Sequence, residues 1–447
     1  MKRLLRTDRL APLAVLAVLI ALAGMLLTAC GSSTTTTTTA GSGSDPATTA
    51  TPGSGTGTTT APAAGGPDIP IGVLVPYTGE LGAYGKAWFR GAEMAVNDIN
   101  NAGGILGGRK IKLYTEDDGS TIEGGTKGAR KLIDANGVIA IHGYLSDYVM
   151  AAWPIAQAAK VFSSIPGAGT TQLDGVGGSY EFRTCPSDAF SGTVAAQVLW
   201  DKGYKEIALL HQNDEGRNSI AKAITAAYQK LGGKIVVDVP FTPGQSTYSA
   251  ELKKVADAKP AAVWLGAGQE SGTTLFKDAA QRGYKWQWMV SEDLAVPELF
   301  GLVGAQTLEG TLTEVPSADQ STEAFKAWAA RYSAVYDDDP GGNYQSNSYD
   351  GVIIMALSMQ AAGQASGTGI NDKYSVIGNP PGTKVYSFQE GMAALAKGED
   401  INYEGISGPC DFAPDGNVTG SYVSEVGKGG KWVVDKFYPA SSFSLAP

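Results

Sequence analysis

Short β-rich runs alternate with helical runs from Asp68 onward, and this alternation constrains the fold more than any other feature. The strand-like runs of the first half are "IPIGVLVP", "KIKLYTEDD", "GVIAIHGY" and "VFSSIPGAG". Helical runs separate them, and in the first one Trp88, Ala92, Ala95 and Ile99 share one face. Strand, helix and strand in this order require right-handed crossovers and a parallel sheet covered on both faces. The pattern therefore predicts a doubly wound α/β lobe.

The same alternation restarts at "EIALLHQND" and continues through "KIVVDVPF", "AAVWLGAG" and "WQWMVSED". The segment "LGGKIVVDV" there is similar to "LGGRKIKLY" in the first half, which indicates a second lobe of the same kind. Helices are expected at 323–336 and 349–362, and strands near "GPCDFAPDGN" and "YVSEVGKGGKWVVDKFY". A chain of 447 residues with 43% hydrophobic residues can bury two such cores.

The N-terminus has the pattern of an export signal. "MKRLLRTDRL" is basic, the stretch from Leu10 to Leu27 is apolar, and "LTAC" ends at Cys30. "LTAC" resembles the bacterial lipobox, in which the cysteine is lipidated and becomes the new N-terminus. Residues 1–29 would then be a signal peptide and Cys30 an anchor on the outer face of the membrane. An ordinary signal peptide and an uncleaved anchor helix are the alternatives.

Residues 31–67 consist almost wholly of Thr, Ser, Gly, Ala and Pro. Such a composition cannot bury enough apolar surface to offset chain entropy, so we expect residues 30–67 to form a disordered, lipid-anchored linker. The net charge is −10 and the basic residues are scattered, which argues against nucleic-acid binding.

Sequence motifs for catalysis and cofactors are missing from the chain. "YTGELGAYG" lacks the G-x-G-x-x-G spacing of a dinucleotide loop, and no G-x-S-x-G elbow is present. His142 and His211 follow different strands without metal-ligand spacing. We therefore expect no catalytic residue, no metal and no cofactor. An enzyme remains an alternative, which turnover assays on amides or amino acids would test.

Open α/β sheets bind ligands at the carboxyl ends of their strands. Ser146 lies directly before a predicted helix, where its hydroxyl is expected to cap that helix, and the helix start offers amide donors to an anion. The loop with Gly167, Ala168 and Thr170 supplies a second cluster of amides. Two such clusters suit a carboxylate.

Five segments carry a family resemblance: "IGVLVPYTGELGAYGKAWFRGAEMAVNDINNAGGILGGRKIKLYTEDD", "GVIAIHGYLSD", "SSIPGAGTT", "YEFRTCPSD" and "SGPCDFAPDGN". Through them the chain resembles the leucine/isoleucine/valine-binding proteins of type I periplasmic-binding fold, which feed ABC importers. The resemblance implies two lobes joined by a three-strand hinge, with crossings near Thr184, Thr313 and Ser407. The expected lobes are 68–184 with 314–407, and 185–313 with 408–447. They would close over an amino acid, branched-chain-like or a related small amide, and dock on an ABC permease. A ligand-sensing receptor without a transport role is the alternative.

The resemblance also implies which residues bind the ligand. Ser146 and the loop of Gly167, Ala168 and Thr170 would hold the ligand carboxylate, and Glu292 in "MVSED" its ammonium. Two aromatic residues would line the pocket, Tyr84 and Tyr344. The chain departs from the family pattern at two positions, where it has Glu215 and Gln269 and relatives carry aromatic residues. The pocket is therefore expected to be more polar than in those relatives.

Two cysteines remain once Cys30 is assigned to lipid. Cys185 and Cys410 form an even pair in an oxidising compartment, which favours a disulfide over two free thiols. Cys185 lies where the chain first leaves lobe one and Cys410 where it last crosses the hinge. We therefore predict a disulfide that joins two adjacent crossings.

Overall fold

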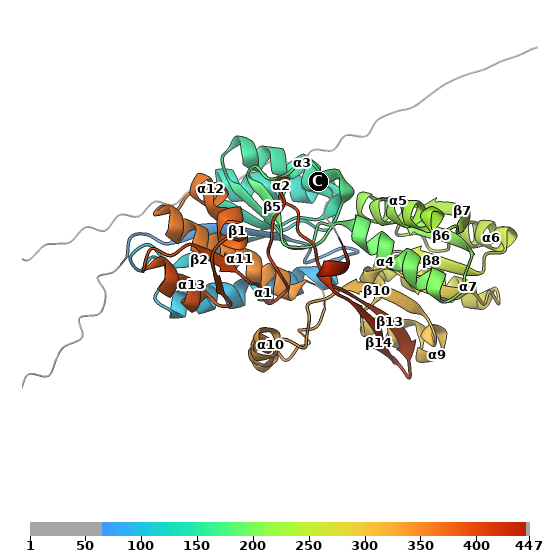
Figure 1. The fold of residues 1–447 in the computed structure, drawn as a ribbon. Helices are drawn as coiled ribbons and strands as arrows, with labels where there is room; N and C mark the ends of the chain where they lie inside the picture. The colour runs from blue at the N-terminus through green and yellow to red at the C-terminus, as the bar shows by residue number, and fades with distance from the viewer. Residues whose placement is uncertain (1–64, 339, 343, 444–447) are drawn as a thin grey trace, which may run out of the picture. The chain divides into compact units, whose positions relative to one another are not determined.

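Two sheets organise the protein in a computed structural model that describes residues 65–443, except residues 339 and 343 (Figure 1). The first sheet is parallel, with the strand order β2-β1-β3-β4-β5. Its strands are β1 (Ile69–Val75), β2 (Ile111–Asp117), β3 (Ala140–Gly143), β4 (Phe162–Ile165) and β5 (Glu181–Arg183). All but the edge strand β2 are almost wholly buried, as expected for apolar strands covered on both faces.

The second sheet has the order β14-β13-β10-β9-β8-β6-β7, parallel from β7 to β10 and antiparallel at β13 and β14. Its strands are β6 (Glu206–Gln212), β7 (Lys234–Phe241), β8 (Ala262–Gly266), β9 (Gln287–Val290), β10 (Leu312–Pro316), β13 (Tyr422–Lys428) and β14 (Lys431–Tyr438). Its edge strands carry Pro240 in β7 and Lys431 and Lys436 in β14. A small parallel pair consists of β11 (Thr383–Val385) and β12 (Ile401–Tyr403).

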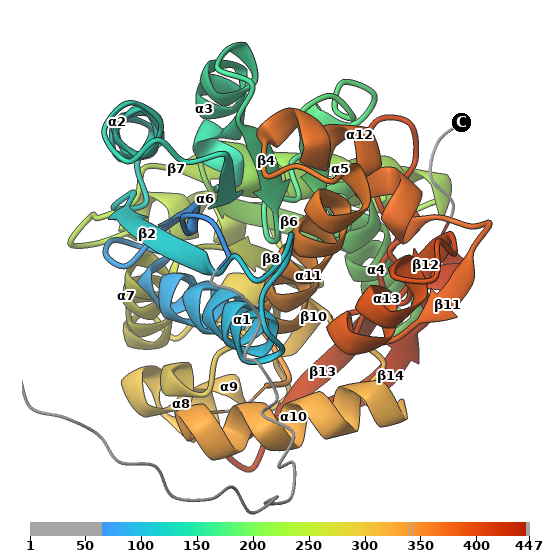
Figure 2. The same cartoon turned by 90° about the vertical axis from the view of Figure 1, so that its left-hand side faces the viewer.

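Helices cover both sheets. The chain moves from β1 outward to β2 and then back across β1 to β3, so right-handed crossovers place α1 and α2 on opposite faces of the first sheet. There α1 packs against α11 and α2 against α3, while α4 packs against α5 on the second sheet (Figure 2). The helices are α1 (Gly82–Asn101), α2 (Ile122–Asp134), α3 (Ser146–Ala158), α4 (Asp188–Asp201), α5 (Glu215–Lys230), α6 (Ser249–Ala258), α7 (Gln269–Gln281), α8 (Glu298–Val303), α9 (Ala305–Leu308), α10 (Glu323–Tyr336), α11 (Gln345–Ala362), α12 (Gly367–Gly378) and α13 (Phe388–Leu395). Short 3₁₀ helices are η1 (Thr171–Leu173), η2 (Glu292–Leu294) and η3 (Ala440–Ser442).

We call the parts around the first and second sheets the first and second lobe. The first lobe has one core of buried residues, and the second has two, one on each side of its sheet. The predicted fold class, α/β with two lobes built on parallel sheets, is confirmed. Helix α11 begins at Gln345, four residues before the predicted start at Tyr349.

Three segments cross between the lobes, and two of the expected positions need correction. The first crossing follows β5, where Thr184 exchanges hydrogen bonds with Asn347. The second follows Pro316, because β10 belongs entirely to the second sheet. The third lies near Val418, which forms a bridge with Pro186. The segment 408–417, described in full, contains no strand, so the strand predicted there is wrong.

The predicted disulfide is also wrong, because Cys185 and Cys410 are both free, buried thiols. The two crossings run side by side at Pro186 and Val418, and Cys410 is still inside the first lobe at that stage of the chain. Its thiol contacts the backbone around Gly408. Adjacent crossings therefore did not bring the two sulfur atoms together.

Some predictions fall outside the described residues. These are the signal peptide, the lipidation of Cys30 and the linker up to residue 64. Within residues 65–443, leaving out 339 and 343, every helix is too short or too polar to cross a bilayer.

Candidate functional site

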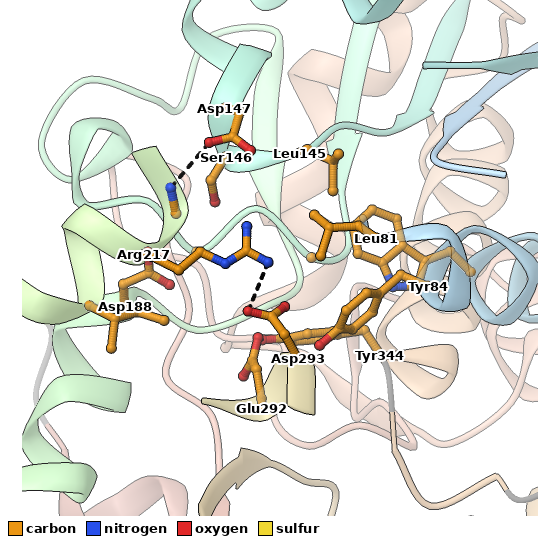
Figure 3. Close-up of a pocket in the computed structure, with 15 residues that line it drawn as sticks. Leu81, Tyr84, Leu145, Ser146, Asp147, Asp188, Arg217, Glu292, Asp293 and Tyr344 are labelled. Atoms are coloured by element: carbon orange, nitrogen blue, oxygen red, sulfur yellow. Dashed lines mark hydrogen bonds and ion pairs between the residues drawn. The ribbon is translucent and has the colours of Figure 1, made fainter. Parts of the chain in front are cut away.

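A cavity of about 40 Å³ lies where the carboxyl ends of the strands of both lobes meet (Figure 3). It has room for about three water molecules, so an amino acid could enter only if side chains or lobes moved apart. Its walls carry aromatic, small and charged residues from both lobes. They are Leu81, Tyr84, Trp88, Leu145, Ser146, Asp147, Gly167, Gly169, Asp188, Gly216, Arg217, Ile220, Glu292, Asp293 and Tyr344.

The aromatic wall comes from the first lobe. Tyr84 lies in the first turn of α1, and its ring contacts Trp88 one turn later, with 5.9 Å between the ring centroids. Both rings also contact Tyr344, at 6.4 Å. Helix α1 can begin this close to β1 because Gly85 has no side chain: a Cβ there would lie 2.0 Å from the carbonyl oxygen of Pro76. Gly85 therefore sets the position of Tyr84.

Ser146 begins α3, but its hydroxyl does not have the predicted capping role. Leu145 occupies the cap position, and the Ser146 hydroxyl accepts a hydrogen bond from the Thr170 amide, at 3.3 Å. The Thr170 hydroxyl in turn donates to Oε1 of Glu215 on the second lobe, at 2.7 Å. The Thr170 amide, which was expected to serve the ligand carboxylate, is therefore already used by Ser146, and the Thr170 hydroxyl by Glu215.

The N-terminus of α5 faces the first lobe. Asp147 accepts hydrogen bonds from the amides of Glu215, at 2.8 Å, and Gly216, at 3.3 Å. Asp214 caps the same helix by accepting from the Arg217 amide, at 3.0 Å. These contacts satisfy the first amides of α5 with protein carboxylates and fix Arg217 at the cavity.

Arg217 is the cation of the cavity wall. Its guanidinium pairs with Asp293, at 2.9 Å, and lies 3.5 Å from Asp214. Burial opposes the charge of Arg217, but Asp214, Asp293 and Asp147 outweigh this effect and raise its pKa. The guanidinium therefore stays charged and is already neutralised by protein carboxylates.

Glu292 and Asp188 each carry an oxygen with no hydrogen-bond partner among the described residues, Oε2 and Oδ2 respectively. The other oxygen of Glu292 accepts from the Tyr344 hydroxyl, at 2.7 Å. Burial, and then Asp293, raise the pKa of Glu292 to about 8, and burial raises the pKa of Asp188 to about 7. Arg183 lowers the pKa of Asp188 and Arg217 lowers that of Glu292, but burial has the larger effect on both.

The described residues do not include a group of three or more His, Cys, Asp or Glu side chains placed to hold a metal ion. Arg217 lies between Asp147 and the adjacent pair Glu292 and Asp293, and the aromatic wall lies to one side of these charges (Figure 3). This arrangement suits an organic solute with polar and apolar parts.

A sequence profile described as periplasmic binding protein matches residues 68–431. The chain belongs to the periplasmic binding protein family. It is 28% identical over 299 residues to an amino acid binding protein of Pseudomonas aeruginosa, covering 66% of this chain and 79% of the relative. It is 28% identical over 329 residues to Leu/Ile/Val-binding protein homolog 3 of Brucella melitensis, covering 71% and 86%. The crystal structure of a leucine-binding protein from Thermotoga maritima has the same fold, with a TM-score of 0.72, 20% identity, and coverage of 84% of this chain and 100% of that one.

In this periplasmic binding protein, four of the residues expected at the site line the cavity directly, and so does one loop glycine. They are Tyr84, Ser146, Glu292, Tyr344 and Gly167. Of the other expected residues, Ala168, Thr170, Glu215 and Gln269 are not among the described residues that line it. Gln269 begins α7, and Glu215 lines an outer groove that adjoins the cavity near Asp147.

Sequence reasoning missed the charged residues Asp147, Asp188, Arg217 and Asp293 as members of this site. Asp147 and Asp293 directly follow the predicted Ser146 and Glu292, so a wider window at each strand end would have included them. Asp188 follows "TCPS" at the start of a helix, and Arg217 lies in the first turn of α5. Helix starts near a sheet switch point are the signal that could have indicated both.

Proposed function

We propose that this protein is the solute-capturing component of an ABC importer for amino acids, and that it works outside the cytoplasm. The proposal is supported by its family and by the relatives named as amino acid and Leu/Ile/Val-binding proteins. The solute is held between the two lobes and delivered to a permease without chemical change.

The observation that carries the proposal is the unpartnered Oε2 of Glu292 in a cavity that also presents Ser146. A buried ammonium needs a charged acceptor, and Glu292 can supply one. The Ser146 hydroxyl and the amides of the Gly167 loop supply donors for a carboxylate. Tyr84 and Tyr344 would cover the apolar part of the solute.

Glu292→Gln tests this arrangement. Gln keeps the shape of the side chain but loses its charge, which leaves a buried ammonium without its ion pair and costs about 2–5 kcal/mol. Amino-acid binding measured by isothermal titration should weaken by about 30-fold to several thousand-fold. Ser146→Ala removes one hydrogen bond and should cost less, about 1–3 kcal/mol. Unchanged affinity of Glu292→Gln would mean that the solute places no ammonium at this side chain.

We also propose that Cys30 is lipidated and holds the protein on the outer face of the cell membrane, because "LTAC" follows a basic and then an apolar stretch. Cys30→Ser should release the protein from membranes in cell fractionation while amino-acid binding is kept. Continued membrane association of Cys30→Ser would contradict the anchor.

A further inference from the structure

The cavity wall carries more negative than positive charge. Four carboxyl side chains line it, and Arg217 is its one cation among the described residues. The four acids are Asp147, Asp188, Glu292 and Asp293. With every group ionised the wall carries a net charge of −3. A neutral amino acid is a zwitterion and adds no net charge to this balance.

Two of the four acids are satisfied by the protein itself. Asp147 accepts from two amides at the start of α5, and Asp293 pairs with Arg217 at 2.9 Å. The other two are Glu292 and Asp188, each with one oxygen that no described residue contacts by a hydrogen bond. Asp188 is only 8% exposed, so solvent does not compensate its charge. Two separate acceptors are thus available to a bound molecule.

Uncharged donors are present at the wall, since Tyr84 Oη and Trp88 Nε1 have no hydrogen-bond partner among the described residues, but its one charged donor, Arg217, is already ion-paired with Asp293. The Thr170 hydroxyl is used by Glu215 and the Thr170 amide by Ser146. Because acidic side chains outnumber basic ones at the wall, a solute with an additional cation matches it better than one with equal numbers of positive and negative charges. An α-amino group can satisfy Glu292, but it leaves Asp188 unpaired, which is unfavourable for a buried carboxylate.

Arg217 raises the opposite possibility, an acidic side chain on the solute. However, the guanidinium is already neutralised by Asp293 and flanked by Asp214. A further carboxylate would also face Asp188 and Glu292 across the same small cavity (Figure 3). An acidic solute would therefore add like charge to a wall that is already negative.

We propose that the captured amino acid carries a second positive charge, a basic side chain that binds Asp188 while Glu292 binds the α-ammonium. This inference rests on the proposed function and specifies the class of its solute. The positions of the two acids support the proposal. Asp188 lies at the start of α4 and Glu292 in η2 after β9, so each acid can bind a different ammonium group of one solute. Burial raises the pKa of both carboxyl groups, as expected for buried acids without a bound cation.

Four probes that differ by single charged groups test the inference on the full-length protein purified in detergent. Lysine has both amines and the carboxylate, norleucine lacks the side-chain amine, cadaverine lacks the carboxylate, and glutamate has an acidic side chain. Lysine should bind at least about 10-fold more tightly than norleucine in isothermal titration, which corresponds to about 1.4 kcal/mol. Glutamate should bind more weakly than both.

Asp188→Asn supplies the matched variant, because it removes the charge but almost no volume. It should weaken lysine binding and reduce the preference for lysine over norleucine to less than about 3-fold. Asp201→Asn, at the exposed opposite end of α4, is the control and should keep the preference. Equal melting temperatures of the two variants would show that both fold.

The outcomes separate this inference from the proposed function. If norleucine or glutamate binds as tightly as lysine, or if Asp188→Asn keeps the preference, the basic side chain is refuted while amino-acid capture stands. If cadaverine binds but none of the amino acids does, the second positive charge stands and amino-acid capture is refuted. If none of the four probes binds, both are refuted.

Discussion

If Glu292 binds the solute ammonium, as proposed, ligand binding is coupled to the protonation of its carboxyl group. Burial raises its pKa to about 8, Asp293 and Asp188 add to the effect, and the Tyr344 hydroxyl and Arg217 oppose it. Glu314, buried on β10, faces the same group. Below about pH 8 the ligand-free protein therefore holds a proton on this carboxyl group. A bound ammonium favours the charged carboxylate, so binding below this pH releases the proton.

Proton release can be measured directly. Titration calorimetry in buffers of different ionisation enthalpy should find about one proton released near pH 6.5 and fewer near pH 8.5, and the affinity should rise with pH up to about 8. Glu292→Gln should abolish this component. Asp188, with a pKa of about 7, would add a second released proton if a basic solute binds it. No proton release near pH 6.5 would contradict the ionised Glu292.

Individual site residues were predictable where a local pattern fixes their position. Tyr84 and Glu292 follow strands at the edge where doubly wound sheets bind ligands, and both line the cavity. Arg217 was not predictable in this way, because its position depends on the Asp214 cap and on a pairing with Asp293 from a distant segment. The use of Thr170 by Glu215 likewise arises only when the two lobes meet.

At the scale of single elements, the start of α1 depends on one glycine. A Cβ at Gly85 would lie 2.0 Å from the Pro76 carbonyl oxygen, whereas a Cβ at Gly82 would lie 3.4 Å from that of Tyr77. Gly85→Ala should therefore shift α1, destabilise the protein by about 1–3 kcal/mol and weaken ligand binding through Tyr84. Gly82→Ala, in the same turn, should be tolerated. Equal stability of the two variants in denaturant unfolding would contradict this account.

Elements with strong periodicity were predicted well, and irregular segments were not. Strands β1–β4 and β6–β9 follow from short β-rich runs, which are local properties of the sequence, whereas β5 and β10 in the same sheets were not predicted. The path of residues 403–407 instead depends on Asp350 in α11, which accepts hydrogen bonds from Tyr403, Ile406 and Ser407. Hydrogen bonds to a residue so distant in the sequence produce no local sequence pattern. The strand predicted at 408–417 and the last crossing predicted near Ser407 were therefore both wrong.

At the scale of the whole molecule, direct hydrogen bonds between the lobes support a closed state. Asp147 binds two amides at the start of α5, and a hydrogen bond to a charged group contributes about 1.5–3 kcal/mol. Asp147→Ala should therefore speed ligand dissociation by about 10-fold or more, with a smaller effect on association. Stopped-flow fluorescence can follow this, since Trp88 lines the cavity. Asp134→Ala, exposed at the end of α2, is the control, and equal dissociation rates in both variants would refute the role of Asp147.

The two edge strands of the second sheet affect how copies of the protein can associate with one another. Val434 is 55% exposed and Phe437 37% exposed on β14, a strand whose outer backbone could pair with a strand of a neighbouring molecule. Lys431 and Lys436 flank them, and desolvating these ammonium groups opposes such pairing. At the other edge Pro240 removes one amide donor from β7. Both edges thus resist edge-to-edge pairing between the sheets of two copies.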